Sequence, residues 1–176
     1  NMDMLDYFFR EPEREFHVRE IAKLVKKSPT TVSKMLKKFV KEKILISEKR
    51  LNHLLFKANN EGREFKQLKL NYNLNLLYKS GLVDYIVEEL NYPEAIILFG
   101  SFAKAENISR SDIDLLIISP TENEINIDKF EEKLGHEIQI FVKSKKDIEI
   151  MKKKNKGLLN NMLNGIKIYG FWEVFK

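Results

Sequence analysis

The residue types best suited to chemistry lie in the passage LFGSFAKAENISRSDIDLLII, at positions 98–118. An apolar run ends at Gly100 and Ser101, and ten residues later Asp112 and Asp114 open a second apolar run. Gly100 allows a sharp turn and a close approach of backbone N–H groups to a phosphate, while Ser101 adds a hydroxyl at the start of a short helix. Carboxylates two residues apart on a strand leave the same face, so Asp112 and Asp114 can hold one Mg²⁺ or Mn²⁺ ion, or a pair. The passage therefore predicts a site for a metal-bound phosphate.

Gly-Ser, ten residues and Asp-x-Asp between two apolar runs form a pattern that resembles the minimal nucleotidyltransferases of the DNA polymerase β-like superfamily. The resemblance implies a nucleoside triphosphate (NTP) as ligand and a hydroxyl group as acceptor. It implies catalytic roles for Ser101, Asp112 and Asp114, with the two aspartates as metal ligands. The implied nucleotide-binding residues are Gly100, Ser101, Lys104 and Ser111.

Two positions depart from the family pattern. Lys104-Ala105 stands where the family usually has Arg-Gly, which keeps the charge. The third carboxylate, which such enzymes place on a later strand to deprotonate the attacking hydroxyl, is replaced by Gln139 in the segment HEIQIFV. A neutral amide cannot act as a base, and Glu137, one pleat away at about 6.6 Å by strand rise, is the candidate substitute. Catalysis with Glu137 and nucleotide binding without efficient catalysis both stay open.

Positive charge is concentrated in one segment. Residues 21–60 contain 11 Lys and Arg against two acids, a net charge of +9, whereas the whole chain carries +5. The remainder therefore carries 20 bases against 24 acids, or −4. A basic segment on an otherwise mildly acidic chain is expected where one domain contacts a polyanion and another does not.

The same basic segment belongs to a domain predicted over residues 1–65. Helical periodicity predicts helices over 2–9, 18–25 and 30–40, with a turn at Ser28-Pro29, followed by a hairpin with strands 45–47 and 54–57. This region resembles the winged helix-turn-helix DNA-binding domains of prokaryotic transcription regulators. The candidate DNA-contacting residues are Thr30, Thr31, Ser33, Lys34, Lys37, Lys38, Arg50 and Asn52. Winged helices also bind proteins, so a protein-interaction module is the alternative.

A second domain is predicted over residues 92–176, after a helical linker at 66–91 with interruptions near 71–75 and 80–81. Strands are expected at 95–99, 112–119, 137–142 and 166–169, and helices at 128–134 and from 145 to about 164. The predicted fold class is α+β with two domains: a winged helix-turn-helix and an α/β nucleotidyltransferase fold with a small mixed sheet flanked by helices.

The composition limits the remaining possibilities. There is no cysteine, and three scattered histidines disfavour a zinc site. No apolar stretch approaches the roughly 18 residues of a membrane span and no signal peptide is evident, so we expect a cytoplasmic protein with no membrane partner. We expect a prokaryotic, archaeal source.

Together these patterns predict a DNA-binding winged-helix protein that binds Mg²⁺–NTP and transfers a nucleoside monophosphate (NMP) to a hydroxyl acceptor on a protein or nucleic acid. In the antitoxin-type transferases that this chain resembles, the acceptor is a protein tyrosine. The expected partners are double-stranded DNA, NTP and a second copy of the chain in a homodimer. The alternative is a non-enzymatic transcription regulator whose degenerate nucleotidyltransferase domain senses nucleotide or mediates dimerisation.

Overall fold

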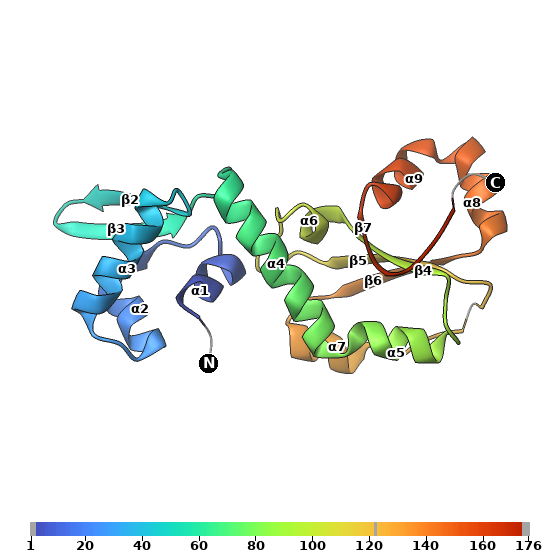
Figure 1. Ribbon diagram of the computed structural model, residues 1–176, viewed down its shortest axis with the longest axis horizontal. Coiled ribbons are helices and arrows are strands. Elements are labelled where there is room, and N and C mark those ends of the chain that lie inside the picture. Colours follow the sequence, from blue (N-terminus) through green and yellow to red (C-terminus); the bar gives the residue numbers. More distant parts are fainter. Residues whose placement is uncertain (1–2, 122, 174–176) are drawn as a thin grey trace. The chain divides into compact units, whose positions relative to one another are not determined.

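Two compact units make up the protein in a computed structural model that describes residues 3–121 and 123–173 (Figure 1). The division falls between Tyr72 and Asn73. It lies inside helix α4 (Arg63–Ser80), within the segment that the sequence assigned to a linker. Among the described residues, no helix combines the length and the apolar character needed to cross a membrane.

Helix α4 continues through the asparagine-rich stretch where the sequence predicted an interruption. Asparagine has a weak helix propensity, but tertiary packing overrides so small a preference. Tyr72 packs against the ring of Phe9, Asn73 is buried, and Leu77 belongs to the core of the second unit. The second predicted interruption is present, because Gly81 takes a positive φ of 85° and ends the helix.

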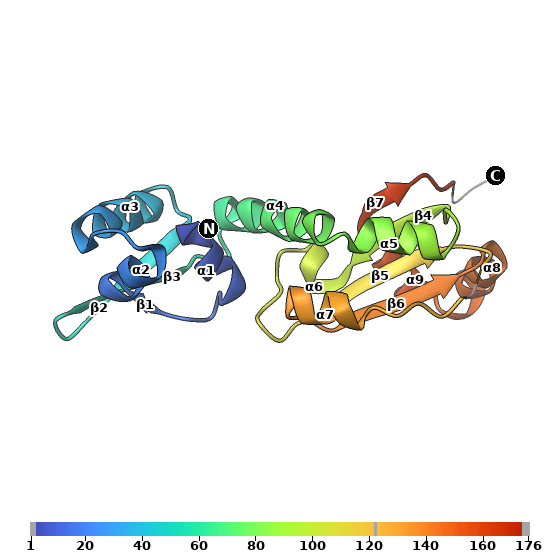
Figure 2. The same ribbon diagram turned by 90° about the horizontal axis from the view of Figure 1, so that it is seen from below.

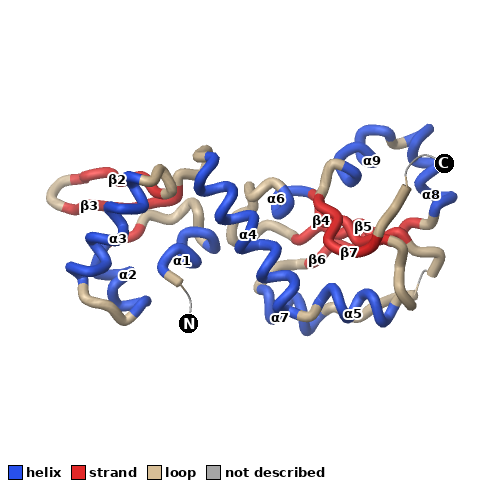
Figure 3. Tube along the Cα trace, in the orientation of Figure 1, coloured by secondary structure: helices blue, strands red, loops and turns tan. Residues whose placement is uncertain are grey.

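The N-terminal unit contains three helices and a small antiparallel sheet before α4 (Figure 3). Its elements are α1 (Met4–Arg10), β1 (Phe16–His17), α2 (Val18–Val25), α3 (Pro29–Lys41), β2 (Leu45–Arg50) and β3 (His53–Ala58). The strand order is β1-β3-β2. Helix α3 begins one residue before the predicted start, because the Ser28 side chain accepts a hydrogen bond from the Thr31 N–H and Pro29 occupies the first helical position. Met2, which the sequence placed in the first helix, lies outside the described residues.

The hairpin is longer and its turn tighter than the sequence predicted. The β2–β3 ladder continues to the pair Arg50↔His53, so only Leu51 and Asn52 remain between the strands. Leu51 takes a φ of 53°. The ends of these strands are exposed and polar, and an apolar pattern cannot reveal such strand ends.

The C-terminal unit is built on a four-stranded sheet of order β6-β5-β4-β7. Strands β5 and β6 are parallel, and the other pairs are antiparallel. Its elements after α4 are α5 (Leu82–Glu89), β4 (Ala95–Phe99), α6 (Gly100–Ala103), β5 (Ile113–Ile118), α7 (Asp128–Leu134), β6 (Ile138–Lys143), α8 (Lys145–Lys154), α9 (Lys156–Leu163) and β7 (Ile166–Gly170). The predicted small mixed sheet flanked by helices is confirmed.

Helices cover both faces of this sheet, with α5 and α7 on one face and α8 and α9 on the other (Figures 1 and 2). Alternate residues of β5 belong to separate cores. Ile113, Leu115 and Ile117 pack with α5 and α7, while Leu116 and Ile118 pack with α8 and α9. Burial on both faces explains why β4 and β5 appear in the sequence as continuous apolar runs. By strand alternation, Asp114 shares the face of Leu116 and Ile118.

Candidate functional site

The Asp114 carboxylate lies in a row of side chains across three strands. Phe99 at the end of β4 is its register partner on one side, and Gln139 of β6 is its partner on the other. Directly paired residues of neighbouring strands project from the same face. Asp114 is therefore flanked by an aromatic ring and an amide, at the end of the sheet where β5 and β6 begin.

The amide of Gln139 bonds to the other aspartate of the pair. Its Nε2 donates a hydrogen bond of 2.8 Å to Asp112 Oδ2. This bond engages one oxygen of Asp112, while Oδ1 makes no hydrogen bond within the described part of the chain. Gln139 is thus a hydrogen-bond donor to Asp112, and its neutral amide cannot act as a base.

Burial raises the pKa of Asp114, and the nearby Asp112 carboxylate raises it further. Two carboxylates held close together in a partly buried site oppose each other's ionisation, and a cation between them would relieve both effects. Mg²⁺ is usually bound by one or two carboxylates together with waters and substrate phosphates. The donor set of Asp112 and Asp114 therefore fits a divalent cation that arrives with a nucleotide.

Glu137 does not complete a cluster of three carboxylates. It precedes β6, its side chain is exposed, and its carbonyl oxygen accepts a 2.8 Å hydrogen bond from the Ile113 N–H. Over the described ranges, no group of three His, Cys, Asp or Glu side chains is close enough to hold a metal. Glu137 consequently serves here as a backbone partner of β5.

Gly100 approaches Asp114 so closely that a side chain would not fit. It takes a φ of 72°, which disfavours L-residues, and a Cβ built there would overlap Asp114 Oδ2. Ser101 is half-buried in α6, and its carbonyl oxygen accepts hydrogen bonds from the N–H groups of Lys104 at 3.2 Å and Glu106 at 2.9 Å. Lys104 is exposed at the end of this helix.

The connection from α6 to Asp112 is held by contacts that the sequence did not reveal. Ser111 Oγ accepts a 2.9 Å hydrogen bond from the Ile108 N–H, and His136 Nδ1 lies 2.7 Å from the Ser111 carbonyl oxygen. The His136 ring also meets Phe102 edge-on at 4.9 Å. Ser111 thus closes a turn in this structure, and its role toward nucleotide stays a prediction.

A comparison with protein families identifies the C-terminal unit. The family described as polymerase beta, nucleotidyltransferase matches residues 82–171, which is half of the chain. The chain belongs to this nucleotidyltransferase family. The match runs from α5 to just beyond β7 and includes Gly100, Ser101, Asp112 and Asp114. A search of curated proteins found no match.

The N-terminal unit lies outside the region matched to the nucleotidyltransferase family. Its helix α3 carries four of the 11 basic residues of segment 21–60: Lys34, Lys37, Lys38 and Lys41. The buried side chains of this helix are Val32 and Leu36. Of the candidate DNA-contacting residues on α3, Ser33 is half-buried and the exposed ones are Thr30, Thr31, Lys34, Lys37 and Lys38. The Thr31 hydroxyl lies 2.8 Å from the capping Ser28 hydroxyl, and Lys38 forms a 3.7 Å ion pair with Glu42.

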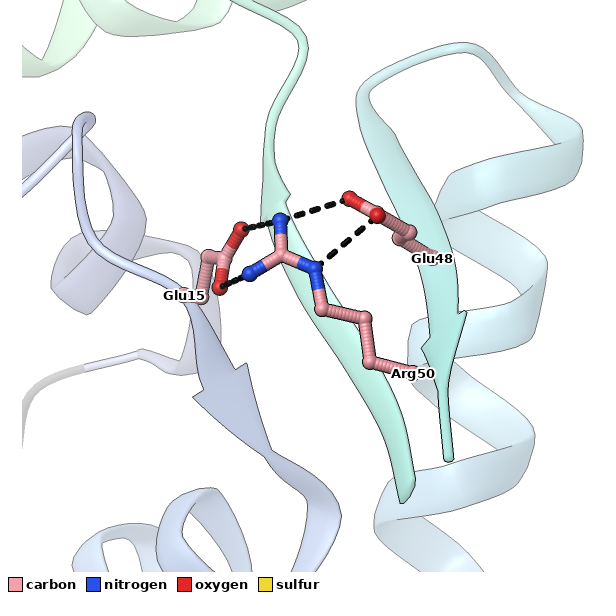
Figure 4. Close-up of polar contacts among 3 residues, drawn as sticks. All are labelled: Glu15, Glu48 and Arg50. Carbon is pink, nitrogen blue, oxygen red and sulfur yellow. Dashed lines mark hydrogen bonds and ion pairs between the residues drawn. The ribbon is translucent and has the colours of Figure 1, made fainter. Parts of the chain in front are cut away.

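Arg50, predicted to contact DNA from the hairpin, is already paired with two carboxylates (Figure 4). Its guanidinium donates hydrogen bonds of 2.9 to 3.1 Å to both oxygens of Glu15 and of 2.9 Å to both oxygens of Glu48. The hydrogen bonds from Arg50 lower the pKa of Glu48. Asn52 is exposed in the turn. The charge of Arg50 is therefore offset within the sheet, unlike that of Lys34 or Lys37.

The close approach at Gly100 leads to a first prediction. Gly100→Ala should rotate the Asp114 carboxylate away from its place, because the new Cβ would overlap Oδ2. Gly135→Ala is the matched control, since Gly135 has the same φ of 72° but nothing within 4 Å of its Cβ position. The free energy of unfolding should fall by roughly 1 to 2 kcal/mol in both variants, because alanine is strained in the left-handed backbone conformation. Only Gly100→Ala should also weaken metal-dependent NTP binding, by about tenfold or more in calorimetric titration. Equal NTP affinity of the two variants would contradict this role of Gly100.

The raised pKa of Asp114 leads to a second prediction. Because the folded protein disfavours ionised Asp114, Asp114→Asn should raise the melting temperature at neutral pH without metal. The advantage should shrink as the pH falls below the raised pKa of Asp114, and it should vanish well below the ordinary aspartate value of 3.8, where wild-type Asp114 is protonated in both the folded and the unfolded state. Mn²⁺ should stabilise the wild type by about 2.7 kcal/mol at roughly 100 times its Kd, and should leave Asp114→Asn unchanged.

Thermal unfolding across this pH range, with and without Mn²⁺, measures both effects. Glu124→Gln, which neutralises an exposed carboxylate outside the site, is the control for net charge. A lower melting temperature for Asp114→Asn without metal at neutral pH would show that Asp114 is stabilised as an anion.

Proposed function

We propose that the C-terminal unit binds a metal-bound NTP and transfers its NMP to a hydroxyl acceptor. The observation that carries this proposal is the placement of Asp112, Asp114 and Gly100 at one end of the sheet, with Gly100 against the Asp114 carboxylate. Membership of the nucleotidyltransferase family supports it.

Each residue has a separate task in this reaction. Asp112 and Asp114 hold Mg²⁺ or Mn²⁺, and Gly100, Ser101 and Lys104 contact the phosphates, with Ser111 at the edge of the same loop. When bound, the metal supplies positive charge that neutralises the triphosphate and stabilises the departing pyrophosphate. The acceptor oxygen bonds to the α-phosphorus while the bond to pyrophosphate breaks. Gln139 cannot take the hydroxyl proton, so that proton passes to water or to Glu137.

A second candidate function is a non-enzymatic nucleotide sensor or dimerisation domain. The hydrogen bond from Gln139 to Asp112 favours it, because an amide stands where the base would act and engages one oxygen of a metal ligand. Binding of metal-bound NTP is common to both candidates, and only transfer separates them.

For the N-terminal unit we propose a winged-helix module that binds double-stranded DNA. The order of three helices and a three-stranded sheet, the exposed face of α3 and the net charge of +9 over residues 21–60 support this function. Thr30, Thr31 and Ser33 near the start of α3 would contact base edges, and Lys34, Lys37 and Lys38 would contact phosphates. Asn52 would contact the backbone from the hairpin. Such modules commonly bind two half-sites, so we propose a homodimer.

The transfer reaction can be tested with labelled ATP, CTP, GTP and UTP, Mg²⁺ or Mn²⁺, and protein or nucleic-acid acceptors. Wild type should transfer label slowly, Asp112→Asn/Asp114→Asn should not, and Gln139→Asp should be faster by about 10- to 100-fold because it restores a base. No label transfer by wild type despite metal-dependent NTP binding would exclude the enzyme and favour the sensor. Transfer by Gln139→Asp but not by the wild type would show that the amide at position 139 is what prevents the reaction.

DNA binding can be tested by the salt dependence of the affinity for a duplex. Lys34→Ala/Lys37→Ala should weaken binding. The negative slope of log K against log salt should become shallower by about 2, because two phosphate contacts are lost. The matched control is Lys146→Ala/Lys153→Ala, which removes two exposed lysines of α8 in the other unit. An equal loss in both double variants would indicate unspecific attraction to net charge and would contradict the assignment of α3.

A further inference from the structure

Asn73 of α4 connects that helix to the segment around Gly100 and Ser101, the loop proposed to bind phosphate. Its side chain is buried, with 1% of its surface exposed. The Nδ2 atom donates one hydrogen bond of 3.0 Å to the carbonyl oxygen of Phe102 and another of 2.9 Å to Asn107 Oδ1. Phe102 directly follows Ser101, and Asn107 lies in the connection toward Asp112. A single amide thus holds both ends of the segment that begins at the phosphate loop.

Stability alone does not account for an asparagine at this position. Its Oδ1 atom is buried and accepts no hydrogen bond within the described residues. A buried acceptor without a donor destabilises the folded protein, because it loses its hydrogen bond to water and gains none in return. Turning the amide over would place Oδ1 against the Phe102 carbonyl oxygen and leave that carbonyl without this donor. In the observed orientation the Phe102 carbonyl oxygen and Asn107 Oδ1 both accept a hydrogen bond from Asn73. The buried acceptor left without a donor is Oδ1 of Asn73 itself.

The same half of α4 is attached to the C-terminal unit at two further points. The Tyr78 hydroxyl donates a 2.9 Å hydrogen bond to the carbonyl oxygen of Ile168 in β7, and Lys133 Nζ of α7 donates one of 2.8 Å to the Ser80 carbonyl oxygen. These attachments fix α4 on the unit in the neighbourhood of Asn73. The family match begins at residue 82, so this segment of α4 is an addition to the matched region.

We propose that Asn73 is a positioning residue for nucleotide binding, through which α4 holds the Gly100–Ser101 loop in the geometry that receives the NTP phosphates. This inference rests on the proposed function, since it names how that site is held. The two hydrogen bonds of Asn73 fix the backbone immediately after Ser101. Without them, the loop must order itself when the nucleotide binds, which weakens binding and leaves the metal ligands in place.

The test compares Asn73→Leu with the matched control Asn75→Leu, which changes an exposed asparagine two residues along the same helix. Asn73→Ser, a smaller change, replaces Asn73→Leu if that variant does not fold. Three quantities are measured on the full chain: the melting temperature, the Kd for ATP with Mn²⁺, and amide hydrogen exchange over residues 100–107. Asn73→Leu should weaken ATP binding by about tenfold and speed exchange in that segment, while Mn²⁺ alone still binds. Asn75→Leu should change none of these.

The outcomes distinguish this inference from the proposed function. A lower melting temperature with unchanged ATP affinity and unchanged exchange at 100–107 would show a merely structural role and overturn the inference. If the wild type binds no NTP, the proposed function fails and so does nucleotide positioning. Faster exchange in Asn73→Leu would then show only that Asn73 holds the loop.

Discussion

The candidate site depends on the contact between the backbone of Gly100 and the carboxylate of Asp114. It requires β4 and β5 to pair in the observed register, because Phe99 then lies opposite Asp114 and the chain turns immediately beyond it. It also requires glycine, since any Cβ would occupy the space of Oδ2. The two apolar cores on either face hold these strands in place, so the packing of the whole unit supports one short contact.

Two negative charges lie close together beside this contact, those of Asp112 and Asp114. Asp114 lies among apolar neighbours and beside Asp112, which disfavours its ionised form. Gln139 donates a hydrogen bond to Asp112 and adds no third negative charge. The amide thus adds no electrostatic repulsion to the two aspartates, but a neutral amide cannot accept a proton. An amide at this position therefore favours the stability of the fold over the ability to accept a proton.

In the N-terminal unit, the basic side chains differ in whether they form ion pairs. Along α3, Lys34 and Lys37 project from a helix whose opposite face is anchored by Val32 and Leu36, and no ion pair with them is found within the described ranges. On the sheet, by contrast, Arg50 is neutralised by Glu15 and Glu48. Lys34 and Lys37 are therefore exposed charges that no ion pair offsets in the described residues, whereas counting along the sequence would give Arg50 the same weight.

The sequence by itself determined the mixed fold of the C-terminal unit, the pairing of a Gly-Ser turn with two aspartates, and the exposed basic face of α3. These features depend on local periodicity and on spacing along the chain. Only the tertiary structure decided that α4 is continuous, that the described residues form no cluster of three carboxylates with Glu137, that Gln139 bonds to Asp112, and that Asn73 reaches Phe102. The physical reason is that such contacts join residues 25 or more positions apart, whose meeting depends on strand register and helix packing.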